Sequence, residues 1–110
     1  MRSRKENENR DAEEIRFIAA CADAFAHPVR VEIFRYIYSE NLNRRRVCNK
    51  DLVEEFGYAQ ATISQHLNKM TLSGLLQAQK EGTRNYYYVN LGLLGKYLNS
   101  VRKLNLPPSR

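Results

Sequence analysis

Apolar residues recur at helical spacing along most of the chain, which predicts a mainly α protein. Four such stretches cover residues 11–26, 28–39, 49–56 and 91–104. Each has an apolar face that needs a core and a polar face suited to water. In the first stretch, the expected inward positions are Ile15, Ile18, Ala22 and Phe25, widened by Phe17, Cys21 and Ala24. In the last stretch they are Leu91, Leu94, Leu98 and Val101, flanked by Tyr97 and Leu104.

Proline and glycine separate these stretches. A residue before proline is pushed out of the helical region, so His27 ends the first helix and Pro28 begins the second. Gly57 is well suited to end the third helix. Residues 41–48 are polar and arginine-rich, and we expect them to form a connection.

Residues 60–73 form the most informative stretch. Ile63, Leu67 and Met70 lie on one face of the predicted helix. The opposite face carries short amides and hydroxyls and one cation: Gln60, Thr62, Ser64, Gln65, Asn68 and Lys69. Uncharged amides and hydroxyls at the start of a helix are suited to reading base edges in a DNA major groove. Together with residues 49–56 and the glycine turn, this helix makes a helix-turn-helix.

After Gly74 the period changes from helical to extended. Residues 75–80 and 85–89 favour strands, and residues 81–84 favour a turn, which predicts a two-stranded wing. The predicted fold is a mainly α winged helix-turn-helix with five helices and a small β-hairpin. We expect one DNA-binding and dimerisation domain at 11–106, a disordered basic tail at 1–10 and a C-terminal tail at 107–110.

The charge of the chain supports a nucleic-acid partner. The 110 residues carry a formal charge of +6. Residues 41–110 hold eleven basic and four acidic side chains, 11 − 4 = +7, so the positive charge gathers where the predicted reading helix lies. Double-stranded DNA is the natural partner for such an asymmetry. With two cysteines, no disulfide framework and no apolar run long enough to cross a membrane, a cytoplasmic protein is expected.

Three motifs at their proper spacing resemble the arsenic-repressor (ArsR/SmtB-like) family of winged-helix transcription regulators. They are Ala26-His27-Pro28-Val29-Arg30-Val31-Glu32-Ile33-Phe34, Gln60-Ala61-Thr62-Ile63-Ser64-Gln65-His66-Leu67, and Lys80-Glu81-Gly82-Thr83-Arg84-Asn85-Tyr86-Tyr87-Tyr88. The resemblance implies a homodimer that pairs through helices 11–26 and 91–104. It also implies a repressor that an inducer releases from a palindromic operator.

The metal sites of many relatives are incomplete in this sequence. The resemblance places Cys48-Asn49-Lys50 where those relatives carry Cys-x-Cys, and residues 91–104 contain neither Asp nor His. We therefore expect no metal and no cofactor. Cys48 lies at the start of a predicted helix, whose dipole favours a thiolate, so redox sensing by Cys48 with Cys21 is a hypothesis. The alternative is two unrelated thiols.

The predicted DNA contacts fall into three groups. Base edges are assigned to Gln60, Ala61, Ser64 and Gln65, phosphates to Thr62, Asn68 and Lys69, and the minor groove or its phosphates to Lys80, Thr83 and Arg84. Two alternatives stay open: a winged-helix module for protein–protein assembly, and a regulator that senses redox or a small organic ligand. No set of residues for catalysis is found, so an enzyme is not expected.

Overall fold

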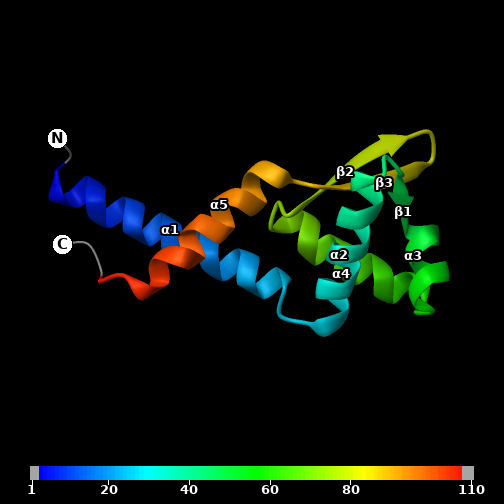
Figure 1. Cartoon of the computed structure of the whole chain (residues 1–110), viewed down its shortest axis with the longest axis horizontal. Coiled ribbons are helices and arrows are strands. Elements are labelled where there is room, and N and C mark those ends of the chain that lie inside the picture. Colours follow the sequence, from blue (N-terminus) through cyan, green and yellow to red (C-terminus); the bar gives the residue numbers. More distant parts are fainter. Residues whose placement is uncertain (1–2, 108–110) are drawn as a thin grey trace.

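The computed structural model describes residues 3–107. Its elements are α1 (Arg4–Ala24), α2 (Pro28–Leu42), β1 (Val47–Cys48), α3 (Asn49–Phe56), α4 (Gln60–Leu72), β2 (Leu76–Glu81), β3 (Arg84–Val89), α5 (Leu91–Arg102) and a 3₁₀ turn, η1 (Lys103–Asn105). In Figure 1, α1 and α5 extend to one end of the molecule, while the hairpin and α3 lie at the other. This order of five helices and a hairpin confirms the predicted winged helix-turn-helix.

The helix-turn-helix itself forms as the sequence predicts. Gly57 ends α3 in the left-handed region, with φ 74°, and its N–H donates to the carbonyl of Val53 at 2.9 Å. Only a residue without a Cβ enters this conformation at no steric cost. Ile63, Leu67 and Met70 are each 0% exposed, so one face of α4 is locked into the core.

The sheet has three strands in the order β1-β3-β2, all antiparallel. The wing hairpin β2–β3 pairs Glu81 with Arg84 across a two-residue loop, and Gly82 supplies the positive φ of 62° at the first loop position. Strand β1 is a correction, because residues 41–48 were expected to be only a connection. Val47 and Cys48 pair with Tyr87 and Tyr86, and two residues are too few to show a strand period in sequence.

The disordered tail predicted at 1–10 is wrong for residues 4–10, which form the first turns of α1; residues 1 and 2 lie outside the described part. Ser3 caps the helix, since its Oγ accepts the Glu6 N–H at 3.2 Å. Arg4 and Glu8 add an i,i+4 ion pair at 3.3 Å. A cap and a helical charge pair can extend a helix without any apolar residue.

In α1 and α5 only part of each predicted stripe is buried within the protomer. Cys21 and Ala24 are buried in α1, whereas Ile15 is 65% exposed. In α5, Leu91 and Leu98 are 60% and 50% exposed. The predicted positions Phe17, and Phe25 at the end of α1, pack on Tyr97 of α5, with ring centroids 6.5 and 6.0 Å apart.

The second helix also differs slightly from the prediction. It runs to Leu42 instead of ending near residue 39, and Asn41 explains the extra turn. Its side chain accepts the Val89 N–H at 3.0 Å and donates to the Tyr87 carbonyl at 3.5 Å, which ties the end of α2 to β3. Ile33 and Ile37 of α2 are 0% exposed and join the common core.

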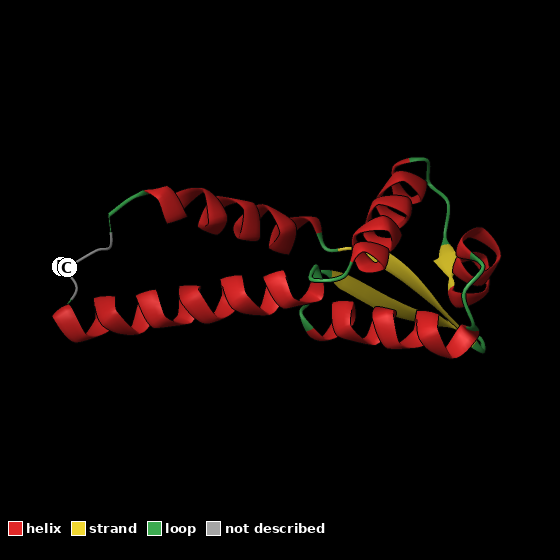
Figure 2. Cartoon of the chain, turned by 90° about the horizontal axis from the view of Figure 1, so that it is seen from below, coloured by secondary structure: helices red, strands yellow, loops and turns green. Residues whose placement is uncertain are grey.

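Figure 2 shows the two regions that result. The helices α1 and α5 run alongside each other and project from the sheet and the remaining three helices. We call α1 and α5 the stalk and residues 28–89 the winged-helix body. Of the helices in residues 3–107, none is both long and apolar enough to cross a membrane.

Candidate nucleic-acid interface

One exposed ridge runs along α4 opposite the buried face. Ala61, Gln65, Asn68 and Leu72 are all exposed and follow one another at steps of four, three and four residues. That spacing places them on a single face of a helix. We call the first three, Ala61, Gln65 and Asn68, the reading ridge. Leu72 follows it on the same face and is 86% exposed. Ala59, the residue before the helix, provides no side-chain cap, so the first N–H groups of α4 are free of a capping oxygen.

The predicted contacts on either side of this ridge are partly engaged within the protein. Ser64 is half-buried, and its Oγ accepts a hydrogen bond from Asn49 Nδ2 of α3 at 2.8 Å. Lys69 Nζ lies 3.1 Å from Asp23 Oδ2 at the end of α1, an exposed ion pair. Thr62 is half-buried. The face predicted as one continuous reading surface is therefore a narrow ridge with two flanks that also fasten α4 to its neighbours.

A hollow of about 350 Å³ lies beside the start of α4, between α3 and the wing. Its lining includes the hydrogen-bond donors Lys50, Gln60, Thr83 and Arg84. The structure thus brings together predicted contacts from α4 and from the wing. It adds Lys50, which the sequence reasoning missed although its cation stands in the first turn of α3, beside the Cys48 that was considered. Lysine and arginine around an open hollow suit a phosphate.

The wing presents its charges at the hairpin end. Lys80, Thr83 and Arg84 are exposed. Arg46, from the connection before β1, forms an ion pair with Glu81 and places its guanidinium 4.3 Å from the centroid of the Tyr86 ring. Arg46 therefore braces the wing from the side of β1, which leaves Lys80 and Arg84 as its outward cations.

A second set of contacts joins α4 to the hinge between α1 and α2. Arg30 donates to the carbonyls of Ala24 and Asp23 at 2.7 and 3.0 Å, and its Nη1 lies 3.5 Å from His66 Nδ1. The centroids of the His66 and His27 rings are 4.8 Å apart. Burial, the nearby His27 and the Arg30 cation lower the pKa of His66. His66 is thus a packing residue that favours its neutral form.

The two thiols are separate and shielded. Cys21 is 0% exposed and Cys48 is 4% exposed, and both are free. Burial raises the pKa of Cys21, which disfavours the reactive thiolate. Cys48 is the residue before α3, as predicted, and its N–H donates to Asp51 Oδ2 at 2.9 Å. This places a carboxylate beside Cys48, so the redox hypothesis gains no support from its surroundings.

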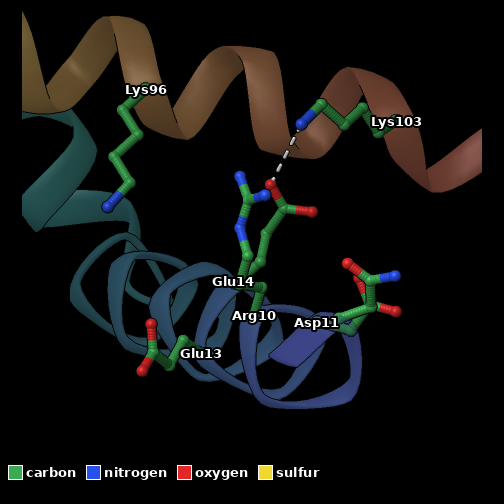
Figure 3. Close-up of a pocket in the computed structure, with 7 residues that line it drawn as sticks. Arg10, Asp11, Glu13, Glu14, Lys96 and Lys103 are labelled. Carbon is green, nitrogen blue, oxygen red and sulfur yellow. Dashed lines mark hydrogen bonds and ion pairs between the residues drawn. The ribbon is translucent and has the colours of Figure 1, made fainter. Parts of the chain in front are cut away.

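The stalk holds a groove of about 590 Å³ between the first half of α1 and α5. Figure 3 shows Glu14 of α1 pointing toward Lys103, the first residue of η1, and Glu14 Oε2 lies 3.2 Å from Lys103 Nζ. Hydrogen bonds from Lys103 lower the pKa of Glu14. The other charged lining residues are Arg10, Asp11, Glu13 and Lys96. Across residues 3–107, no group of three or more His, Cys, Asp or Glu side chains could hold a metal ion.

Comparison with known proteins agrees with this geometry. The family model described as "Bacterial regulatory protein, arsR family" matches residues 27–78, which run from the start of α2 into β2. An uncharacterized HTH-type transcriptional regulator of Methanocaldococcus jannaschii is 38% identical over 66 residues, 60% of this chain and 70% of that protein. The chain belongs to the ArsR family of transcriptional regulators. As members of this family are regulators, it is not an enzyme.

Two further proteins resemble it at lower identity. The arsenical resistance operon repressor of Staphylococcus aureus is 27% identical over 64 residues, 58% of this chain and 62% of that protein. A homodimeric winged helix-turn-helix DNA-binding domain from Mycobacterium bovis, solved by NMR, has a TM-score of 0.64 at 20% identity. The match covers 91% of this chain and 94% of that one, so the shared fold includes the stalk as well as the body.

Proposed function

We propose that this ArsR-family regulator is a homodimeric repressor that binds a palindromic operator. The observation that carries the proposal is the reading ridge Ala61, Gln65 and Asn68, exposed on a helix whose other face is rigidly buried. Beside it, the hollow and the wing gather Lys50, Lys80 and Arg84, which would hold the phosphates on either side.

The stalk supports the dimer. Three of its apolar side chains, Ile15, Leu91 and Leu98, are at least half exposed in the protomer, as are Leu104 and Leu106 just after α5. Such a surface is typical of a subunit interface. A second copy, packed through α1 and α5 about a two-fold axis, would cover it, as a homodimer is reported for the similar Mycobacterium bovis domain. The repressor role rests on likeness to the Staphylococcus aureus repressor.

In this dimer the two α4 helices would enter successive major grooves on one face of the DNA, about 34–36 Å apart. Selection of bound duplexes from a random pool tests the proposal directly. We expect a palindrome with half-sites about 10–10.5 base pairs apart between centres. A set of selected duplexes without two-fold symmetry would contradict dimeric reading. Equal retention of all duplexes would favour a protein–protein module instead.

A small ligand in the stalk is a second candidate, favoured by the charged groove between α1 and α5. With three cations and three carboxylates around it, the groove suits a polar, charged molecule better than an apolar one. Release of the protein from its selected duplex, tested against a panel of amino acids and organic acids, would support this role. The test variant is Glu14→Gln, which removes one carboxylate of the groove and should weaken the release of the protein from DNA by the small molecule.

A further inference from the structure

The reading ridge carries no cationic side chain. The cation of α4, Lys69, lies on a flank and is paired with Asp23. Lys50 and Arg84 line the hollow at the start of the helix and are proposed phosphate contacts. Guanine is most often read by arginine or lysine, which donate two hydrogen bonds to O6 and N7. The ridge therefore lacks the side chains that select G·C pairs.

What the ridge does carry matches A·T pairs. Glutamine and asparagine each donate one hydrogen bond to adenine N7 and accept one from N6, and a small methyl group packs against the C5-methyl of thymine. Gln65 and Asn68 supply the amides, and Ala61 supplies the methyl group. Asn68, which the sequence assigned to a phosphate, moves to the base contacts because it is exposed on the same face as Gln65. All three side chains are exposed, so the two amides and the methyl group are accessible to DNA.

Two neighbouring polar side chains do not disturb this reading. Ser64 has its hydroxyl bonded to Asn49, and Gln60 lines the hollow with Lys50 and Arg84. From Ala61 to Asn68 the helix rises about 10 Å, which equals roughly three base-pair steps at 3.4 Å each. The three side chains of the reading ridge thus reach three base pairs within a run of about four in each half-site.

On the basis of the proposed operator function, we propose that these three base pairs are A·T, with a thymine methyl against Ala61 and adenines against Gln65 and Asn68. The structure assigns this preference to the ridge of this chain, since other residues at these three positions would read other bases.

Base analogues placed in the selected duplex test each contact. Replacing the thymine opposite Ala61 by uracil removes one methyl group and should weaken binding by about fourfold. In Ala61→Gly the same replacement should have less than half that effect, and because each ratio is measured on one variant, changes in folding cancel. Replacing adenine by 7-deazaadenine removes N7 and should weaken wild-type binding by about 5- to 100-fold at the Gln65 pair. Gln65→Ala should not respond to it.

A gain of specificity gives the sharpest outcome. In Gln65→Arg, one position of each half-site should change its preference from A·T to G·C. Ser39→Arg adds the same charge on an exposed position of α2 and should leave the preference unchanged. A palindrome with G·C pairs beneath α4, or an unchanged preference in Gln65→Arg, would overturn the inference and leave the operator proposal intact. Absence of any palindrome would overturn the operator proposal itself.

Discussion

The winged-helix body and the stalk use their apolar residues differently. In the body, three apolar side chains of α4, Ile63, Leu67 and Met70, face the core and are 0% exposed. In the stalk, apolar positions are divided between an inner side, such as Cys21 at 0%, and an outer side, such as Ile15 at 65%. The body completes its own interior, whereas the stalk is arranged for a second surface. An apolar period therefore shows that a face is to be buried and does not show by which chain.

The largest expected effect is in the body. Leu67→Ala removes a fully buried side chain of α4 and should lower the free energy of unfolding by about 2–5 kcal/mol. The matched control is Leu72→Ala on the same helix, where the side chain is 86% exposed, with an expected change below about 0.5 kcal/mol. Urea unfolding followed by circular dichroism measures both. Equal effects would mean that α4 is not held through this face.

A charge on the outer side of the stalk comes next. Leu98→Asp should raise the dissociation constant of the proposed dimer at least tenfold, which is about 1.4 kcal/mol, because a carboxylate would be buried between apolar surfaces. Leu42→Asp makes the same change at a 66% exposed position of α2 and should leave the dimer intact. Sedimentation measures the assembly. A Leu98→Asp dimer as tight as the wild type would place the interface elsewhere.

The flanking cations should act on all DNA alike. Lys50→Ala and Arg84→Ala each remove one proposed phosphate contact, so each should reduce the slope of log affinity against log salt by about 1 without changing sequence preference. Lys5→Ala, an equal loss of charge on the exposed first turn of α1, is the control. Fluorescence anisotropy over a salt series measures the slopes. A changed preference in Arg84→Ala would show that the wing reads bases.

The smallest effect concerns His66, which packs at the hinge between α1 and α2. Since folding lowers the pKa of His66, the unfolded chain binds more protons between that lowered value and about 6.5, the ordinary value. This contribution to stability is fully present above pH 6.5 and is lost as the pH falls through the lowered pKa. His27, Arg30 and the Asp23–Lys69 pair surround this site. Urea unfolding between pH 5 and 8 should show a shallower decline in His66→Gln, and an unchanged decline would assign it to other groups.

The sequence predicts the body better than the stalk for a physical reason. Local signals such as Gly57, Gly82 and the period of α4 act within a few residues and are legible in one chain. Strand β1 is not predicted from the sequence, because its two residues pair with Tyr86 and Tyr87 about forty positions away. The helical start of α1 is not predicted either, because the Ser3 cap and the Arg4–Glu8 ion pair support it without apolar residues.

The candidate site follows the same division. The residue types of the reading helix predict its polar face, and all ten predicted contacts lie on α4 or the wing. Their sorting into ridge and flanks depends on neighbours distant in sequence: Asn49 holds Ser64, and Asp23 holds Lys69. Lys50 enters the site only once α3 and the wing are placed beside each other. Spacing alone does not reveal such contacts.

The central claim is that the ridge of α4 reads the operator, and Gln65→Ala tests it most directly. The measurement is the ratio of affinities for the selected duplex and for a scrambled duplex of equal length and salt. Gln77→Ala, which removes an exposed amide from β2, serves as the control. We expect the ratio to fall about 5- to 100-fold in Gln65→Ala and to stay at the wild-type value in Gln77→Ala. An undiminished ratio in Gln65→Ala would contradict the claim.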